Sequence, residues 1–409
     1  MSHSRSYERR VVLVMHLTWG FVFLDRMAQL YLAPYFAPEL RISDAEVGLL
    51  AAAIAMSWAL SSFCFGALAD RVGYRAILIP MVFAFSALSI MSSFVRSFSD
   101  LLIVRVLMGI AEGPCWSIMN VIVQRASHPS RRGKNIGIVV SAAAVIGLAV
   151  APVLTTQVAA SFGWRAAFAV AGVPGIILGI VIWCFIDEPE REPVAARSRP
   201  GWRDLVDIAR QRSIVLCAVG AGGFIGWLTL TNAFAPLYIT RVAGRDGATA
   251  GFLLGAAGLG SVVVGVIASQ LSDRVGRRIV LSLVSAASLL LPLFLLIGPL
   301  YDHLWLLAAL LFATQGGQVM SALLIVIVPS ESVPSRHAGA AIGLVTLVGE
   351  VFGATLLPSI GGRLAVSHGL SAPLLLAAAS MSVVFVVTLA LHEPGRTAVG
   401  NVASPSGPV

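Results

Sequence analysis

Long apolar stretches separated by short polar segments run along almost the whole chain. A helix needs about 20 mostly apolar residues to cross a bilayer, because each residue adds about 1.5 Å along the helix axis. Twelve stretches reach this length, at residues 11–37, 46–68, 76–95, 100–124, 136–160, 164–186, 213–240, 248–271, 279–298, 304–328, 338–362 and 371–391. The pattern predicts an all-α membrane protein with twelve transmembrane helices, six in each half of the chain.

One polar segment, residues 187–212, divides these stretches into two groups of six. It contains six arginines, six acidic residues and three prolines, a composition typical of a linker outside the membrane. The predicted domains are two six-helix bundles, residues 1–186 and 213–392, joined by this linker, in which residues 202–212 can form a surface helix. Residues 393–409, rich in Gly, Pro, Ser and Val, predict a disordered tail.

The two groups of helices carry related sequences. The segment GALADRVGYR, which begins at Gly66, corresponds to SQLSDRVGRR, which begins at Ser269, so that Asp70 and Asp273 lie 203 residues apart. A Pro-Ser-Arg tripeptide and a Glu-Pro dipeptide each recur after 205 residues. Apolar repeats of about 200 residues are far too long for solenoid units and match the parallel halves of large secondary transporters.

The composition agrees with a membrane protein and argues against other classes of protein. Hydrophobic residues make up 57% and charged residues 12% of the chain, and the mean hydropathy is +0.89, outside the range of soluble domains. The cysteines lie singly in apolar stretches, without the spacing of a metal site or a disulfide framework. The first stretch is too long and too charged for a cleaved signal peptide, so we expect it to remain attached.

The basic residues set the predicted orientation. With residue 1 in the cytoplasm, 20 of the 28 Lys and Arg residues fall in cytoplasmic segments, 6 in external loops and 2 within helices, as the positive-inside rule requires. Both termini are therefore predicted to be cytoplasmic, and the composition favours a bacterial inner membrane. The pI of about 9.9 follows from basic residues beside apolar spans, so no nucleic-acid partner is expected.

Five charged residues lie deep inside the predicted spans: Asp25, Arg26, Arg105, Glu112 and Glu350. Each costs about 2.5 to 3.5 kcal/mol at the centre of a membrane helix unless it finds a partner, so such residues are retained for function or for pairing. At about 1.5 Å per residue, the three acids lie roughly 18 to 21 Å from the cytoplasmic ends of their helices, near the midplane of the bilayer.

These residue types predict a site for an anion and for protons. Arginine keeps its charge in a desolvated cavity and offers a planar fork that matches a carboxylate. Burial disfavours the charged form of a carboxyl group, which can then load and release a proton. The predicted substrate-binding residues are Arg26, Gln29, Trp58, Gln315 and Gln318, and the predicted proton-coupling residues are Asp25, Glu112 and Glu350. No metal ion is expected, and no cofactor beyond the coupling proton.

The first copy of the repeated turn extends into a longer motif. The pattern Gly-x-Leu-Ala-Asp-Arg-x-Gly-x-Arg is matched by Gly66, Leu68, Ala69, Asp70, Arg71, Gly73 and Arg75, and the second copy keeps Asp273, Arg274, Gly276, Arg277 and Arg278. With this motif the chain resembles the major facilitator superfamily, which implies two halves that rock about a central site. The predicted gating residues are Asp70, Arg71, Arg75, Asp273 and Arg274, together with Arg105 nearer the external side.

A narrower motif combines residues of the first and fourth stretches: Asp25, Arg26, Arg105, Gly109 and Glu112. In this motif the chain resembles the anion:cation symporter family, which includes bacterial sugar-acid transporters, vesicular glutamate transporters and sialin. The resemblance implies that Arg26 binds the substrate anion, while Asp25 and Glu112 carry protons. It also implies an aromatic residue from the second helix in the site, and Trp58 takes that position, where a tyrosine is expected.

Structural roles for the same residues remain open. Asp25 and Arg26 can form an ion pair that fastens the first helix to a neighbour, and Glu112 can neutralise Arg105, seven positions earlier on the same helical face. Glu350 can pair with a helix end instead of taking a proton. The glutamines of the tenth stretch can link helices, as polar groups often do in membranes.

The leading hypothesis is a proton-coupled symporter of a small organic anion, such as a sugar acid or a monocarboxylate, that works by alternating access. Two complete halves make a functional monomer sufficient. A drug/proton antiporter is the alternative, because Gly147 with Ala151 and Pro152 partly matches the antiporter glycine-proline motif. A membrane-bound sensor lacks an appended signalling domain, and an enzyme lacks a constellation of His, Cys or Ser with catalytic spacing.

Overall fold

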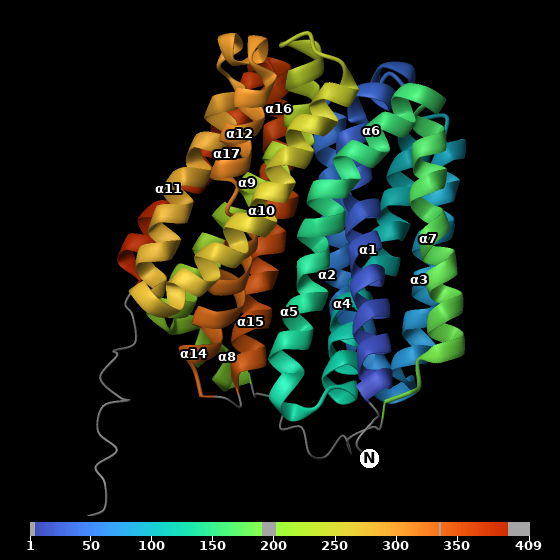
Figure 1. The fold of residues 1–409 in the computed structure, drawn as a ribbon, viewed down its shortest axis with the longest axis vertical. Coiled ribbons are helices and arrows are strands. Elements are labelled where there is room, and N and C mark those ends of the chain that lie inside the picture. Colours follow the sequence, from blue (N-terminus) through green and yellow to red (C-terminus); the bar gives the residue numbers. More distant parts are fainter. Residues whose placement is uncertain (1–4, 190–201, 335–336, 392–409) are drawn as a thin grey trace, which may run out of the picture.

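The computed structural model describes residues 5–189, 202–334 and 337–391, and within them the chain consists of helices and short connections without a β-strand (Figure 1). This confirms the predicted all-α class. Residues 393–409, for which the sequence predicts disorder, and residues 190–201 of the predicted linker lie outside the described residues.

The first half of the fold comprises the helices up to residue 185. Its elements are α1 (Arg5–Glu39), α2 (Asp44–Val72), α3 (Tyr74–Met91), η1 (Ser92–Phe94), α4 (Phe98–Ala126), η2 (Pro129–Arg131), α5 (Arg132–Ala142), the π-helical η3 (Ala143–Val150), α6 (Ala151–Phe162) and α7 (Trp164–Phe185). The segments α5, η3 and α6 follow one another directly and form the fifth predicted span.

A short helix, α8 (Trp202–Arg210), precedes the second half and confirms the helix predicted in the linker. The elements of the second half are α9 (Arg212–Arg241), α10 (Gly247–Val275), α11 (Arg277–Leu295), η5 (Gly298–Asp302), α12 (Leu304–Thr314), α13 (Gly317–Met320), η6 (Ser321–Ile327), α14 (Val328–Glu331), α15 (Ala338–Val348), η8 (Gly349–Leu356), α16 (Leu357–His368) and α17 (Ser371–Ala390). The segments η6 and η8 are π-helical.

Eleven helices of the described chain are long and apolar enough to cross a membrane. The tenth predicted span, residues 304–328, differs because its helix is interrupted after Thr314. Gln315 has an extended backbone, and its side-chain Oε1 accepts a hydrogen bond of 3.0 Å from the Gly317 backbone N–H. The Gly316 N–H is bonded to Ser288 Oγ at 3.1 Å. These local bonds compete with the helical ladder, which two consecutive glycines weaken further.

The duplicated turn has the same backbone conformation in both halves. Gly73, between α2 and α3, has φ 127°, and Gly276, between α10 and α11, has φ 109°. Glycine occupies this region at little cost, whereas a Cβ atom strains it. The signature glycine is therefore required by the tight connection between two antiparallel helices.

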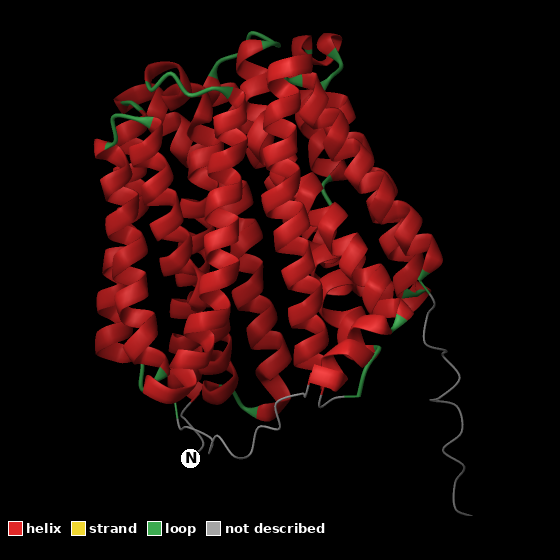
Figure 2. Cartoon of the chain, turned by 180° about the vertical axis from the view of Figure 1, so that it is seen from behind, coloured by secondary structure: helices red, strands yellow, loops and turns green. Residues whose placement is uncertain are grey.

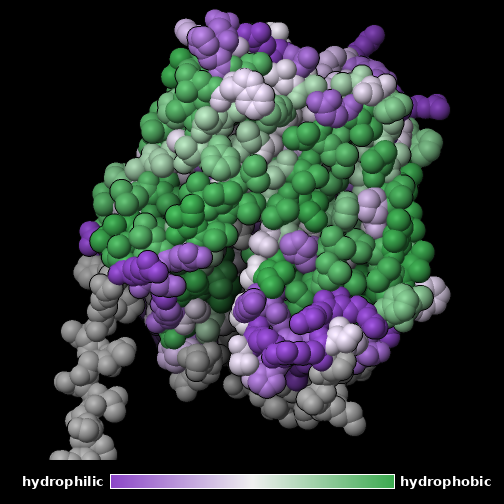
Figure 3. All heavy atoms as spheres, viewed as in Figure 1, coloured by the Kyte–Doolittle hydropathy of each residue, from purple (hydrophilic) through white to green (hydrophobic). Residues whose placement is uncertain are grey.

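Among the described residues, the two halves meet closely at one end of the molecule. We call the end that carries Arg5 the near end, at the bottom of Figure 1, and the opposite end the far end. At the far end the Arg241 guanidinium forms an ion pair of 2.7 Å with Asp44, across the halves. Most connections lie at the two ends (Figure 2). On the face seen in Figure 3, apolar side chains cover the middle, and a hollow opens between the halves at the near end.

Glycines allow this close approach. A Cβ atom on Gly48 of α2 would lie 2.3 Å from the Pro358 carbonyl oxygen of α16, and one on Gly251 of α10 would lie 2.5 Å from the Pro152 carbonyl oxygen of α6. Any larger side chain at these positions would therefore push the halves apart. The halves are therefore in close contact at the far end and separated by a hollow at the near end.

Candidate functional site

Helix α1 supplies three polar side chains to the middle of the molecule. Asp25, Arg26 and Gln29 are 1%, 8% and 2% exposed. Consecutive helical residues point about 100° apart, so Asp25 and Arg26 contact different partners. The Asp25 carboxylate accepts a hydrogen bond of 2.6 Å from the Ser89 hydroxyl of α3, inside the first half. Asp25 and Arg26 therefore do not pair with each other.

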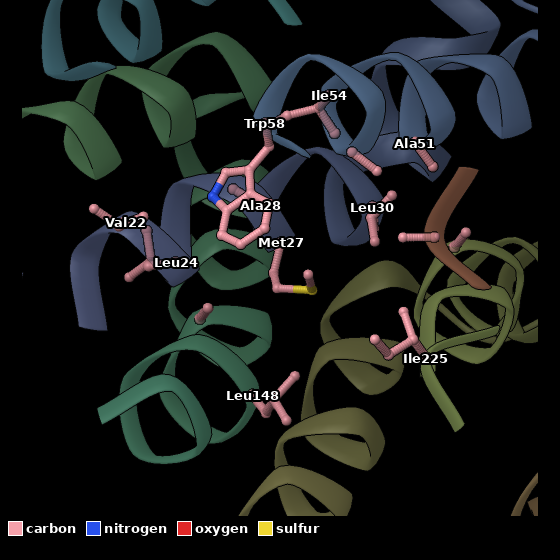
Figure 4. Close-up of a cluster of buried hydrophobic side chains, with 14 of the residues drawn as sticks. Val22, Leu24, Met27, Ala28, Leu30, Ala51, Ile54, Trp58, Leu148 and Ile225 are labelled. Carbon is pink, nitrogen blue, oxygen red and sulfur yellow. The ribbon is translucent and has the colours of Figure 1, made fainter. Parts of the chain in front are cut away.

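Arg26 points towards the second half. Its Nη2 donates a hydrogen bond of 2.9 Å to Glu350 Oε2 of η8, and the two side chains form a buried ion pair. On its other side, the guanidinium carbon lies 5.1 Å from the centroid of the Trp58 ring, a cation–π geometry. Figure 4 shows the Trp58 indole, carried by α2, close to Met27 and Ala28 of α1. The structure thus brings together three residues predicted for the site.

Glu112 and Arg105 lie on α4 in the interior of the first half, and both are fully buried. Arg105 donates to Ser92 Oγ at 2.5 Å and to Met108 Sδ at 3.1 Å, and it lies over the Phe168 ring at 4.9 Å. Among the described residues no carboxylate forms an ion pair with Arg105. The predicted gating role of Arg105 stays a prediction, and its partners all belong to the first half.

We call the buried charged residues Asp25, Arg26, Arg105, Glu112 and Glu350 the central layer. Three carboxylate oxygens of this layer have no hydrogen-bond partner among the described residues: Asp25 Oδ2, Glu112 Oε1 and Glu112 Oε2. A buried carboxylate without donors is costly in its charged form and much less costly when protonated. These positions can therefore hold protons. The Oε1 atom of Gln29 and the indole N–H of Trp58 are also without partners in the described chain, so both are available to a ligand.

The second half contributes mainly uncharged polar groups. Tyr31 of α1 donates a hydrogen bond of 3.0 Å to Asn232 Oδ1 of α9, across the halves. The Trp227 indole N–H and the Thr231 hydroxyl, also on α9, are buried without partners among the described residues. These four residues were not predicted for the site, because the prediction was based on charged residues. Their signal in the sequence is a polar group inside an apolar stretch.

The predicted glutamines are less informative. Gln315 is 5% exposed, and its carbonyl oxygen is occupied by the Gly317 N–H. The side chain of Gln318 lies outside the described part of the structure. Substrate binding by either residue stays a prediction.

The predicted gating residues of the first half lie at the near end. Asp70 accepts a hydrogen bond of 2.8 Å from the Tyr74 hydroxyl. Glu188 accepts hydrogen bonds from the backbone N–H groups of Tyr74 and Arg75, at 2.7 and 2.9 Å, and so caps the start of α3. Glu188 thus attaches the start of the linker to the first half, and its capping role was not predicted.

In the second copy of the motif the contacts differ. Arg277, which corresponds to Tyr74, forms an ion pair with Glu331, and Asp273 is exposed at the surface. The two copies of the turn therefore share a backbone conformation but differ in the contact made by the residue after the glycine, and the gating roles of Asp273 and Arg274 stay predictions.

Comparison with known proteins gives one family and several relatives. The family model described as Major Facilitator Superfamily matches residues 16–354. A hexuronate transporter of Bacillus subtilis (strain 168) is 25% identical over 57% of this chain and 57% of its own length. A protein named "Probable L-galactonate transporter" from Escherichia coli (strain K12) is 27% identical over 58% of this chain and 56% of its own. The matches thus span little more than half of these two relatives.

Other matches extend over more of the chain. An MFS-type efflux pump of Mycolicibacterium smegmatis is 24% identical over 68% of this chain and 66% of its own length. Among solved structures, a bacterial homologue of the human lysosomal transporter Spinster, in an inward-facing and unoccupied conformation, has a TM-score of 0.73 at 19% identity and covers 95% of this chain and 96% of that one. At this identity the likeness concerns the fold.

Proposed function

The chain belongs to the Major Facilitator Superfamily, and from this premise we propose that it is a proton-coupled symporter that moves a small organic anion across the membrane by alternating access. Membership makes it a multi-pass membrane transporter, with relatives that are named transporters of organic acids. The substrate class, the coupling ion and the direction of coupling are the proposed part.

The observation that carries the proposal is the layer formed by Arg26, Asp25 and Glu112. Arg26 presents a permanent positive charge between the two halves, and the two acids of the first half have oxygens without donors in the described chain. An arginine in a shielded cavity selects for carboxylate, because its planar fork matches two oxygens. The two acids supply groups whose charge can be switched by protons.

The arrangement supports a simple cycle. A hollow lies between the halves at the near end, and close helix contacts join the halves at the far end, which supports access to the central layer from the near end. A carboxylate that binds Arg26 and protons that load Asp25 and Glu112 together reduce the charge of the layer. The halves then rock about this site and expose it to the opposite side.

A drug/proton antiporter is the second candidate, because one of the relatives is named an MFS-type efflux pump. The positive charge of Arg26 in the central layer would repel a lipophilic cation. The symporter is therefore the better match to the charges of the site.

The deciding experiment is uptake into proteoliposomes, together with thermal-shift binding by purified protein. Candidate ligands are D-glucuronate, L-galactonate and 4-hydroxybenzoate, with tetraphenylphosphonium as a lipophilic cation. We expect a carboxylate to raise the melting temperature, and we expect an inward proton gradient to drive its uptake. Both effects should disappear in Arg26→Ala. Both should persist in Arg241→Ala, which removes the far-end arginine that forms an ion pair with Asp44 across the halves. Stabilisation by the cation alone, unchanged in Arg26→Ala, would favour the antiporter.

We further propose a bacterial inner-membrane location with both termini in the cytoplasm, action as a monomer, and no cofactor beyond protons. The distribution of basic residues supports the orientation. Single-cysteine labelling in intact cells tests it: a cysteine at Arg165, at the far end, should react with an impermeant reagent, and a cysteine at Lys134 should not.

A further inference from the structure

The buried charges of the first half have one partner in the second half. Among the ion pairs between described residues, Arg241 with Asp44 at the far end and Arg26 with Glu350 in the middle of the molecule cross the halves. The Arg26 and Glu350 side chains are 9% and 11% exposed. The predicted substrate-binding arginine is thus already bound to a carboxylate that belongs to the protein.

Glu350 is carried by a tightly held segment. It lies in the π-helical η8, a conformation often found at functional sites. A Cβ atom on Gly353 would lie 2.7 Å from the Gly222 carbonyl oxygen and 2.8 Å from the Gly226 nitrogen, so η8 packs directly against the backbone of α9. The Thr229 hydroxyl also donates to the Gly353 carbonyl oxygen at 3.0 Å. The Glu350 carboxylate therefore moves with the second half.

We propose that Glu350 is a resident competitor for the substrate: its carboxylate occupies the anion position at Arg26 in the empty transporter, and a substrate carboxylate binds by displacing it. The inference rests on the proposed function. Arg26 donates one hydrogen bond to the Glu350 carboxylate, at 2.9 Å, whereas a free carboxylate can use both of its oxygens on the guanidinium fork. A substrate with the right geometry can therefore displace the tethered group.

Displacement also links anion binding to a proton. Once Arg26 is taken by substrate, the Glu350 carboxylate is left buried without its counter-charge, which strongly disfavours the ionised form. The surrounding helices offer no replacement nearby: between its ends α9 has no acidic, basic or histidine residue, α15 has none, and the charged residues of α2 lie near its ends. Arg363 and His368 of α16 lie 13 and 18 residues further along the chain, in the half of α16 that leads to the far end. The other charged groups in the middle of the molecule are those of the first half, Asp25, Glu112 and Arg105. Glu350 then takes a proton from solvent as the anion binds.

A first test needs no knowledge of the substrate. Glu350→Ala removes the atoms of an acetate ion, so sodium acetate should refill the position beside Arg26. We expect acetate to raise the melting temperature of Glu350→Ala more than equimolar sodium chloride does, and to do so neither in the wild-type protein nor in the double variant with Arg26→Ala. An equal acetate effect in all three proteins, or in none, would overturn the proposal.

A second test uses Glu350→Gln, which keeps the side-chain volume and so guards against misfolding of the alanine variant. If Glu350 occupies Arg26 about 90% of the time, removing its charge strengthens apparent binding about tenfold. D-glucuronate titrations by calorimetry, in buffers of different ionisation enthalpy, should give this gain and one proton fewer taken up per anion bound.

Asp44→Asn is the matched control, because it breaks the other cross-half ion pair and leaves the central layer intact. Unchanged or weaker binding by Glu350→Gln, or the same gain in Asp44→Asn, would contradict competition at Arg26. Failure of the proposed function and failure of the competition at Arg26 give different results. Acetate rescue without transport of any organic anion would defeat the proposed function alone. Proton-driven uptake with Glu350→Gln indistinguishable from wild type would defeat the competition alone.

Discussion

The two halves of the molecule share a backbone plan but differ in the charges they bury. Gly73 and Gly276 make equivalent turns at φ 127° and 109°. In the described central layer, however, the first half holds Asp25, Arg26, Arg105 and Glu112, whereas the second half holds Glu350 as its one buried charge. The repeated features are those that helix packing demands, and the features that differ are those that ions would use.

This difference separates framework from chemistry. The framework depends on close contacts in both halves: a Cβ atom on Gly109 would lie 2.5 Å from the Ile54 carbonyl oxygen, and one on Gly353 would meet α9 in the same way. The proposed chemistry is divided between the halves, since the first half carries Asp25 and Glu112, the proposed proton sites, and the second half carries Glu350, which pairs with Arg26. The following predictions test this division, beginning with the largest effect.

Neutralising one proton site should lower concentrative uptake while leaving exchange intact. Each coupled proton driven by 100 mV supplies about 2.3 kcal/mol, which corresponds to about 50-fold in accumulation. We therefore expect Glu112→Gln and Asp25→Asn each to lower the accumulation of labelled substrate in proteoliposomes about 50-fold per 100 mV. Counterflow exchange at equal pH should persist, because Arg26 still binds the anion. Loss of exchange as well would place these acids in the framework.

A framework substitution should act on stability rather than on coupling. In Gly109→Ala the new methyl group would meet Ser57 Oγ and the Ile54 carbonyl oxygen, at 2.0 and 2.5 Å, so α2 and α4 must separate. Such overpacking costs about 1 to 3 kcal/mol, which should lower the melting temperature measured in detergent. Gly339→Ala is the control, since a Cβ atom there meets nothing within 4 Å. Equal melting temperatures for the two variants would show that the helix pair can yield.

The sequence was sufficient for the framework because hydropathy and turn glycines are local properties. The predicted spans end within a few residues of the observed helices, and the exception, the break after Thr314, arises from Gln315 bonding to the neighbouring backbone. The site was predictable only as an inventory of charges. The pairing of Arg26 with Glu350 joins residues 324 positions apart, and which carboxylate an arginine meets depends on how the two halves dock.

The two signature aspartates offer a smaller test of the same comparison. Asp70 is bonded to the Tyr74 hydroxyl at 2.8 Å, whereas Asp273 is exposed and its neighbour Arg277 is paired with Glu331. A hydrogen bond to a charged group is worth about 1.5 to 3 kcal/mol. We expect Asp70→Asn to slow transport about tenfold and Asp273→Asn about twofold, measured as initial uptake rates. The reverse order would assign the principal gate to the second half.

The smallest effect is expected at the uncharged contact between the halves. Tyr31→Phe removes the hydroxyl that donates to Asn232 Oδ1 at 3.0 Å, and a neutral hydrogen bond contributes about 0.5 to 1.5 kcal/mol. Apparent substrate affinity should therefore change about threefold. The number of protons taken up per anion should not change, because neither a tyrosine nor an asparagine side chain gains or loses a proton at physiological pH. The ion pair of Arg26 also remains. A shift in proton number on this substitution would mean that coupling depends on how the halves dock, and not only on Asp25, Glu112 and Glu350.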